Sequence, residues 1–255
     1  MIGLGTFVPP VAQGVPATGG AVAEVRSALL TAIHERYRSN PRSRQTAVGP
    51  SQVGHPCGRN LAFLASGHPR SEQYNDPWPS ILGTAAHAWL AETLEQYPTI
   101  WITERRVHVG GGMSGSGDAF HIPTGTVVDF KVLGNTTFTQ LRNEDPASAY
   151  WFTGGGQTYR TQLQCYGTGF VNAGFQVRHV TLAVLGRAKR LSDLYMVPWE
   201  YDPAVSQRAL ARLQAARTLA SAGVHPMAVP AQPGHCHFCP FKGSESDGLC
   251  EAGNN

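Results

Sequence analysis

Residues 126–132, TVVDFKV, place a carboxylate and an ammonium group on an otherwise apolar stretch. Alternate residues of a β-strand face the same side, so Asp129 and Lys131 are expected to point together while their apolar neighbours pack. Two opposite charges side by side on such a strand require an explanation. A charged cross-strand pair at a sheet edge is one interpretation. The other is a metal-binding carboxylate beside a lysine that orients or activates a water.

A second carboxylate is expected to join this pair. Asp118, in SGSGDAF, stands at a transition from glycines to a predicted strand. A hairpin through residues 122–125 (IPTG) would fold Asp118 back beside Asp129. Two carboxylates converging on one face make a hard-oxygen site suited to Mg²⁺ or Mn²⁺. Taken alone, Asp118 is also typical of a residue that ends a turn.

Two predicted helices carry polar residues that can reach such a site. In ILGTAAHAWL, His87 shares an apolar stripe with Gly83, and the glycine allows another backbone or a metal to approach closely. A histidine on such a stripe is either a core residue or a ligand. In QLQCY, Gln162 and Tyr166 are four residues apart and share a helix face. This pair is suited to holding a phosphate, a water or the catalytic lysine.

Composition limits the class of protein. The chain has 255 residues, 42% hydrophobic and 15% charged, which predicts a globular protein of one large or two small domains. No apolar run approaches the roughly 20 residues of a membrane span, and the N-terminus lacks a secretory signal. We therefore expect a cytoplasmic protein. A net charge of +3 excludes nucleic-acid binding by bulk charge alone but allows a local basic groove.

Hydrophobic periodicity predicts a mixed set of elements. Pro77 to Pro79 are expected to break the chain. Helices are expected over residues 21–38, from Ser51 to Ala65, over 81–96 with Ser80 as the cap, over 157–171, and in a long helix capped by Asp202. Strands are expected over residues 100–109, 116–133, 177–185 and 194–199.

The cysteines add a second pattern. They lie at positions 57, 165, 236, 239 and 250, and the last three have the spacing C-x2-C-x10-C. An odd count without an export signal makes a disulfide framework a poor explanation. The clustering suggests instead that thiolates gather on a metal.

The polar motifs follow one another in a definite order: G-x-x-x-H at 83–87, Glu104 before a strand, G-D at 117–118, D-x-K at 129–131 and Q-x-x-x-Y at 162–166. This order resembles the RecB-like branch of the PD-(D/E)XK nuclease superfamily, over residues 51–250. The resemblance implies an α/β restriction-endonuclease-like core, a central mixed sheet flanked by helices, with N- and C-terminal segments joined by a metal cluster. It implies one nuclease domain over residues 21–255 behind a flexible arm of residues 1–20.

The cysteine layout resembles the iron–sulfur branch of that superfamily, which includes CRISPR-associated exonucleases, AddB-type helicase–nuclease subunits and phage exonucleases. The resemblance implies a 4Fe–4S cluster held by Cys57, Cys236, Cys239 and Cys250. Zn²⁺ also accepts four thiolates. The gap before Cys250 is longer than expected of the family, so His235 and His237 are substitute ligands. Cys165 is expected to be a packing residue.

The resemblance also assigns roles. It implies the catalytic residues Asp118, Asp129, Lys131, Gln162 and Tyr166, and the Mg²⁺ or Mn²⁺ ligands His87, Asp118, Asp129 and the Phe130 carbonyl. Lys131 would position the attacking water and stabilise charge on the phosphate. Gln162 and Tyr166 would hold the motif and the substrate backbone.

The expected function is a metal-dependent DNA exonuclease that acts on single-stranded DNA or free ends, in phage or CRISPR-type DNA processing or recombination. A groove of arginines would hold the DNA, with Arg59, Arg105, Arg106 and Arg160 as candidates and with base stacking on Trp78, Trp151 or Tyr159. One alternative is a non-catalytic scaffold that binds DNA ends with the same fold. Another is a Zn-stabilised binding protein without nuclease activity.

Overall fold

A computed structural model describes residues 19–39, 47–70, 76–232, 234, 236, 239–243 and 250. The chain divides into two compact units, residues 1–45 and 46–255. In the first unit, α1 (Gly19–Arg38) confirms the predicted helix and carries Arg36 and Arg38 in its last turn, where positive charge favours the helix dipole. The predicted arm lies almost wholly outside the described residues, so the domain boundary at residue 20 stays a prediction.

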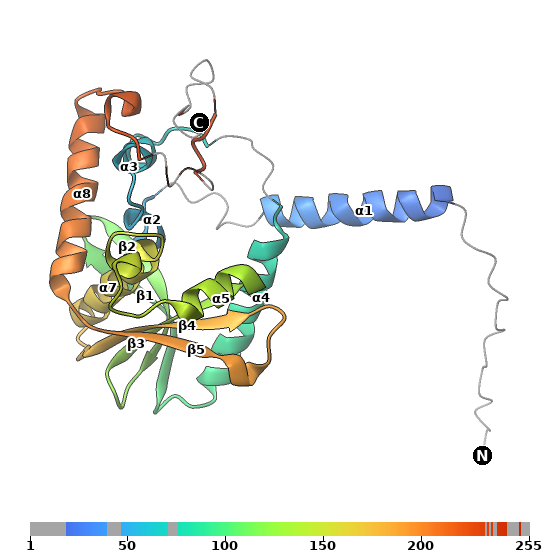
Figure 1. Ribbon diagram of the computed structural model, residues 1–255, viewed down its shortest axis with the longest axis horizontal. Coiled ribbons are helices and arrows are strands. Elements are labelled where there is room, and N and C mark those ends of the chain that lie inside the picture. Colours follow the sequence, from blue (N-terminus) through green and yellow to red (C-terminus); the bar gives the residue numbers. More distant parts are fainter. Residues whose placement is uncertain are drawn as a thin grey trace. The chain divides into compact units, whose positions relative to one another are not determined.

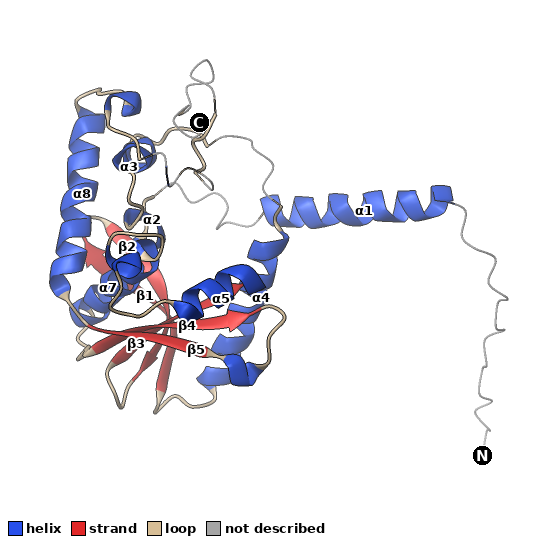
Figure 2. Cartoon of the chain, in the orientation of Figure 1, coloured by secondary structure: helices blue, strands red, loops and turns tan. Residues whose placement is uncertain are grey.

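The second unit is built on one mixed sheet, shown as a layer with helices packed against it in Figure 2. Its strands are β1 (Trp101–Gly110), β2 (Met113–His121), β3 (Thr126–Leu133), β4 (His179–Gly186) and β5 (Tyr195–Glu200). They lie in sequence order, with every neighbouring pair antiparallel except β3 and β4, which are parallel. The predicted α/β fold with a central mixed sheet is confirmed. The predicted segment 116–133 is a hairpin of two strands.

The parallel pair requires a long crossover, because the chain must return to the same end of the sheet. The crossover consists of α5 (Asn135–Asn143), α6 (Ala149–Phe152) and α7 (Gln157–Asn172). On this face, Leu163 and Phe170 of α7 are buried against Val107 and Phe120 of the sheet. The periodicity of residues 157–171 predicted α7, whereas α5 and α6 were not predicted.

The opposite face of the sheet is covered by α4 (Trp78–Glu95), whose Leu94 packs against Ala119 and Val128. Ser80 does not cap this helix as predicted. The helix begins two residues earlier, and the side chain of Asp76 accepts the N–H of Trp78 at 3.0 Å. The helix therefore starts at the prolines that were expected only to break the chain.

A further layer joins early and late segments of the unit. It contains α2 (Pro50–Val53), α3 (Gly58–Ala65), α8 (Pro203–Ser221) and the 3₁₀ turn η3 (Pro226–Ala228), and a second 3₁₀ turn, η2 (Leu191–Asp193), precedes β5. Figure 1 shows α8 beside α3. The single helix predicted from Ser51 is two helices, because Pro56 interrupts it before Cys57. Asp202 caps α8 as predicted and accepts the N–H of Ala204 at 2.9 Å. Within the described residues, no helix is long and apolar enough to cross a membrane.

Candidate active site

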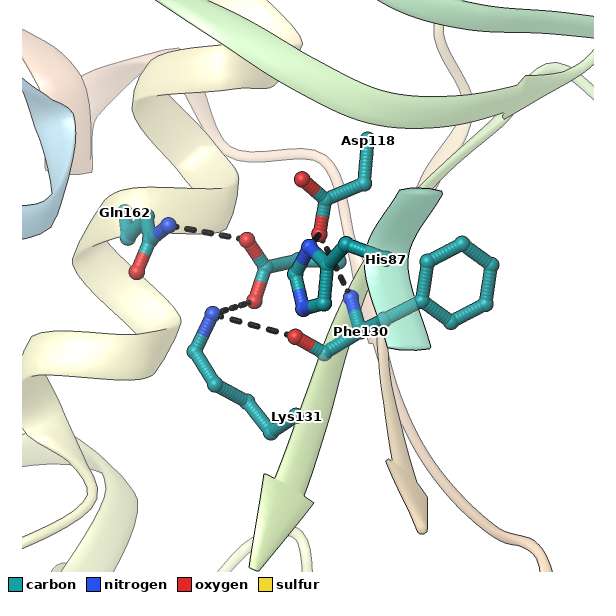
Figure 3. A network of polar contacts seen from close by, with 6 residues as sticks. His87, Asp118, Phe130, Lys131 and Gln162 are labelled. Carbon is teal, nitrogen blue, oxygen red and sulfur yellow. Dashed lines mark hydrogen bonds and ion pairs between the residues drawn. The ribbon is translucent and has the colours of Figure 1, made fainter. Parts of the chain in front are cut away.

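Asp129 is hydrogen-bonded to two of the residues labelled in Figure 3, Lys131 and Gln162, and its side chain is only 1% exposed. Its Oδ1 accepts a hydrogen bond from Nε2 of Gln162 on α7 at 2.8 Å, and its Oδ2 accepts one from Nζ of Lys131 on the same strand. Both oxygens are therefore satisfied, which is the condition for burying a carboxylate. The predicted common face of Asp129 and Lys131 is confirmed, and its partner is α7.

Each charge of this pair affects the pKa of the other residue. Burial raises the pKa of Asp129 to about 6, although the ammonium of Lys131 opposes this rise. Burial lowers the pKa of Lys131, but the carboxylates of Asp129 and Asp118 outweigh it and leave the pKa raised. Lys131 also donates to the Phe130 carbonyl at 3.3 Å.

Asp118 occupies the point where β2 and β3 diverge. The two strands are paired from His121 and Thr126 as far as Ala119 and Val128. The N–H of Phe130 donates to Oδ2 of Asp118 at 2.8 Å, so a side chain continues the hydrogen bonding between the strands. The predicted hairpin thus brings Asp118 beside the Asp129 strand.

His87 reaches the same carboxylate from the other face of the sheet. Its Nδ1 lies 3.4 Å from Oδ2 of Asp118. Burial lowers the pKa of His87, but the hydrogen bond to Asp118 and the charge of that residue outweigh it, so the pKa is raised. Gly83 is not a point of close approach, because a Cβ added there would meet no atom within 4 Å.

Glu104 is a third candidate ligand, and the predicted ligand set omitted it. One ligand atom from each of His87, Glu104 and Asp118 lies within 4.8 Å of the other two. Glu104 has a φ of 45°, in the left-handed region that costs a non-glycine residue about 1–2 kcal/mol. The residues on either side of Glu104, Thr103 and Arg105, both pair with β2. The motif order contained this residue, but local sequence carried no signal for the backbone conformation.

Two tyrosines of α7 lie near the site: Tyr159 is beside Lys131, and Tyr166 packs in the core against the sheet. The Tyr159 ring centre lies 5.9 Å from Nζ of Lys131, and burial raises the pKa of this tyrosine. Tyr166 is 7% exposed and belongs to the core under the sheet. A Cβ at Gly115 would lie 3.0 Å from its ring. The predicted substrate contact of Tyr166 stays a prediction.

The expected nucleic-acid residues divide into exposed and packed ones. Arg105 and Arg106 are exposed on β1. The Arg160 guanidinium lies 4.2 Å from the centre of the Phe152 ring. Trp151 is fully buried, so it is not available to stack on a base.

The cysteine group, defined as Cys57, Cys236, Cys239 and Cys250, joins segments far apart in the sequence. Burial raises the pKa of Cys236, and the charges of the other three cysteines raise it further. Sγ of Cys57 accepts the N–H of Gln232 at 3.4 Å. Cys165 differs from the cysteine group because burial, without the charge of another cysteine, raises the pKa of its thiol to about 12. His235 and His237 lie outside the described residues.

Side chains of α3 contribute donors to the cysteine group. Nδ2 of Asn60 donates to Sγ of Cys239 at 3.3 Å, and Nη1 of Arg59 donates to Sγ of Cys250 at 3.4 Å. Sulfur atoms surrounded by N–H donors suit a metal–thiolate group. The contacts of Arg59 therefore differ from those expected of a DNA-binding residue.

No protein-family model matches the chain, and no curated protein matches its sequence significantly. The fold is similar to the crystal structure of an alkaline exonuclease (LHK-Exo) from Laribacter hongkongensis, with a TM-score of 0.50 and 13% identity over 73% of this chain and 94% of that chain. The structure of LHK-Exo in complex with dAMP gives a TM-score of 0.48 and 15% identity over 72% of this chain and 93% of that chain. The first similarity shows that the chain shares the fold of that protein.

Proposed function

We propose that this chain is a metal-dependent deoxyribonuclease that hydrolyses phosphodiester bonds from DNA ends. The observation that carries the proposal is the ion pair of Asp129 and Lys131, fixed by Gln162 and placed beside a second carboxylate and an imidazole. The shared fold supports it, since a protein of the same fold is an alkaline exonuclease. A sheet-edge ion pair would not need the hydrogen bond from α7.

The residues fit a divalent metal. His87, Asp118, Asp129 and the Phe130 carbonyl would hold Mg²⁺ or Mn²⁺, with Glu104 within reach of the first two. Carboxylate and carbonyl oxygens are the ligands these cations prefer. When bound, the metal supplies a water of lowered pKa and neutralises charge on the phosphate.

Gln162, Lys131 and Asp129 have separate roles in this proposal. Gln162 fixes the orientation of the Asp129 carboxylate by holding Oδ1. The side chain of Lys131 is 21% exposed, and its ammonium would meet both a phosphate and an attacking water. Asp129 itself is enclosed, with only 1% of its side chain exposed. Its role is to orient Lys131 and to present its remaining lone pairs to a cation.

We further propose that the cysteine group holds a 4Fe–4S cluster. The two side-chain donors and the Gln232 N–H, all directed at sulfur, support a negatively charged metal–sulfur group. Zn²⁺ would give a colourless protein, whereas the cluster absorbs broadly near about 400 nm. A role in phage or CRISPR-type DNA processing rests on the sequence resemblance alone.

The test is digestion of end-labelled single-stranded and double-stranded DNA and of a covalently closed circle, each with Mg²⁺ or Mn²⁺. We expect linear DNA to be degraded and the circle to be spared. Lys131→Met should cleave about 10²–10⁴-fold more slowly than the wild type. Lys189→Met, which removes an exposed lysine, should cleave like the wild type. Binding of DNA ends without cleavage by the wild type would favour the scaffold function instead.

A further inference from the structure

Helix α3 directs two consecutive side chains at the cysteine group. Cys57 is the N-cap of this helix. Asn60 is 4% exposed, and Nδ2 lies 3.3 Å from Sγ of Cys239. Burying a side-chain amide is costly unless it is hydrogen-bonded, and a neutral thiol is a weak acceptor. The buried amide of Asn60 is therefore better satisfied by a thiolate sulfur, which carries negative charge, than by a neutral thiol.

Arg59 contacts three residues from the late part of the chain at once. Its Nε donates to the carbonyl of Val229 at 2.7 Å, while Nη1 reaches Sγ of Cys250 at 3.4 Å and Sδ of Met227 at 3.7 Å. The carbonyl bond fixes the guanidinium plane, so the direction of its second N–H is set. The positive charge is thus held against the cysteine whose sequence spacing was least expected.

Further positive charge surrounds the same sulfurs. Arg212 of α8 donates to the carbonyls of His55 and Pro56 at 2.9 and 3.1 Å, immediately before Cys57. The charge of Cys57 acts on this guanidinium, and Lys242 acts on Cys236. The negative charge of four thiolates exceeds the positive charge of the cations that they commonly bind. Buried negative charge is stable only when it is paired.

We propose that Arg59 and Asn60 are positioning residues of the cysteine group. They hold two of its sulfur atoms in the negatively charged, metal-bound form, which raises the reduction potential of the cluster and slows its loss. N–H donors to sulfur favour the more negative, reduced form of a cluster, and that preference sets the direction of the potential. The inference rests on the proposed iron–sulfur cluster and is independent of DNA cleavage.

The experiment compares anaerobically purified wild type with Asn60→Leu, Asn60→Asp and Arg59→Met. Leucine keeps the branched shape of Asn60 without the donor, and aspartate keeps its shape but presents a carboxylate to the sulfur. Arg208→Met is the matched control, because it removes an exposed α8 arginine. For each protein, iron and sulfide are counted, the potential is titrated with the reduced cluster followed by EPR, and cluster loss to a chelator is timed.

We expect Asn60→Leu to lose its cluster about 10-fold faster than the wild type, at the lower end of the 10–100-fold effect of outer ligand partners. The reduction potential of Asn60→Leu should fall below that of the wild type. Asn60→Asp should show a larger fall in potential and faster cluster loss. Arg208→Met should match the wild type in both measurements. If Arg59→Met does not fold, Asn60→Leu decides. Iron-containing variants with wild-type potential and wild-type release would overturn this inference alone. A wild type without iron would overturn the cluster and the inference together.

Discussion

At the scale of single residues, burial separates the roles of Asp129 and Lys131. The Asp129 side chain is 1% exposed, whereas the Lys131 side chain is 21% exposed. Truncating the lysine therefore has two separable consequences, one on chemistry and one on stability.

Lys131→Met should lower the cleavage rate by about 10²–10⁴-fold, because charge on the phosphate loses its ammonium partner. It should also lower the free energy of unfolding by about 1–3 kcal/mol, since Asp129 stays buried without its cation. Single-turnover cleavage and urea unfolding measure the two effects. The double variant Asp129→Asn/Lys131→Met should regain stability but not activity. A double variant as unstable as the single one would contradict the ion-pair explanation.

Glu104 combines a metal-binding carboxylate with a strained backbone. Glu104→Gly and Glu104→Ala both remove the carboxylate, but only glycine relieves a φ of 45°. We expect the glycine variant to be more stable than the alanine variant by about 1 kcal/mol in chemical unfolding. Glu104→Gln keeps the strain and should raise the Mn²⁺ concentration at half-maximal cleavage. An unchanged Mn²⁺ requirement in all three would remove Glu104 from the site.

At the scale of elements, α7 connects the sheet to the site, and its glycines set how closely it packs. A Cβ on Gly169 would lie 2.5 Å from Cγ2 of Val107 on β1. Gln162 stands two turns earlier on the same helix, so a shift of α7 would reach its contact with Asp129.

Gly169→Ala should therefore lower the free energy of unfolding by about 1–3 kcal/mol through overpacking. Gly83→Ala is the matched helix-interior control: a Cβ there meets nothing within 4 Å, so alanine should stabilise α4 by about 0.5–1 kcal/mol. Thermal or urea unfolding checks both values. Equal effects of the two substitutions would show that helix propensity, rather than the contact with β1, dominates.

Local sequence predicted the elements with a strong period and the residues they carry. The alternation of residues 126–132 predicted β3, and the four-residue spacing of Gln162 and Tyr166 placed them on α7. The hairpin placed Asp118 correctly. What local sequence could not predict were the conformation of Glu104, the burial of Asp129 and the direction of Arg59. Each of these depends on a segment distant in sequence: β2, α7 and the late cysteine segment, respectively.

At the scale of the whole molecule, the cysteine group ties α3 to the end of the described chain. Cys57→Ala, Cys236→Ala and Cys239→Ala should each give colourless, poorly soluble protein, because metal-binding energy in such a site is folding energy. Cys165→Ala should stay coloured and active, since its buried thiol lies in α7. Iron and sulfide analysis measures the result.

Cys250 decides the ligand set. Its sulfur accepts from Arg59, and its charge acts on Cys236, so we expect Cys250→Ala to lose iron like the other three. Full cluster content in Cys250→Ala would assign its place to another residue, with His235 and His237 the first to be substituted.

The parallel pairing of β3 with β4 also determines what an incomplete chain looks like. Asp129 and Gln162 are 33 positions apart, and β4 follows both. Until β4 has been synthesised, β3 is the outermost strand of a three-stranded hairpin sheet, with Val127 and Val128 on a free edge. Unpaired apolar edges template aggregation. We therefore expect nascent chains that stall within the crossover to aggregate, and chains that have released β4 to remain dispersed.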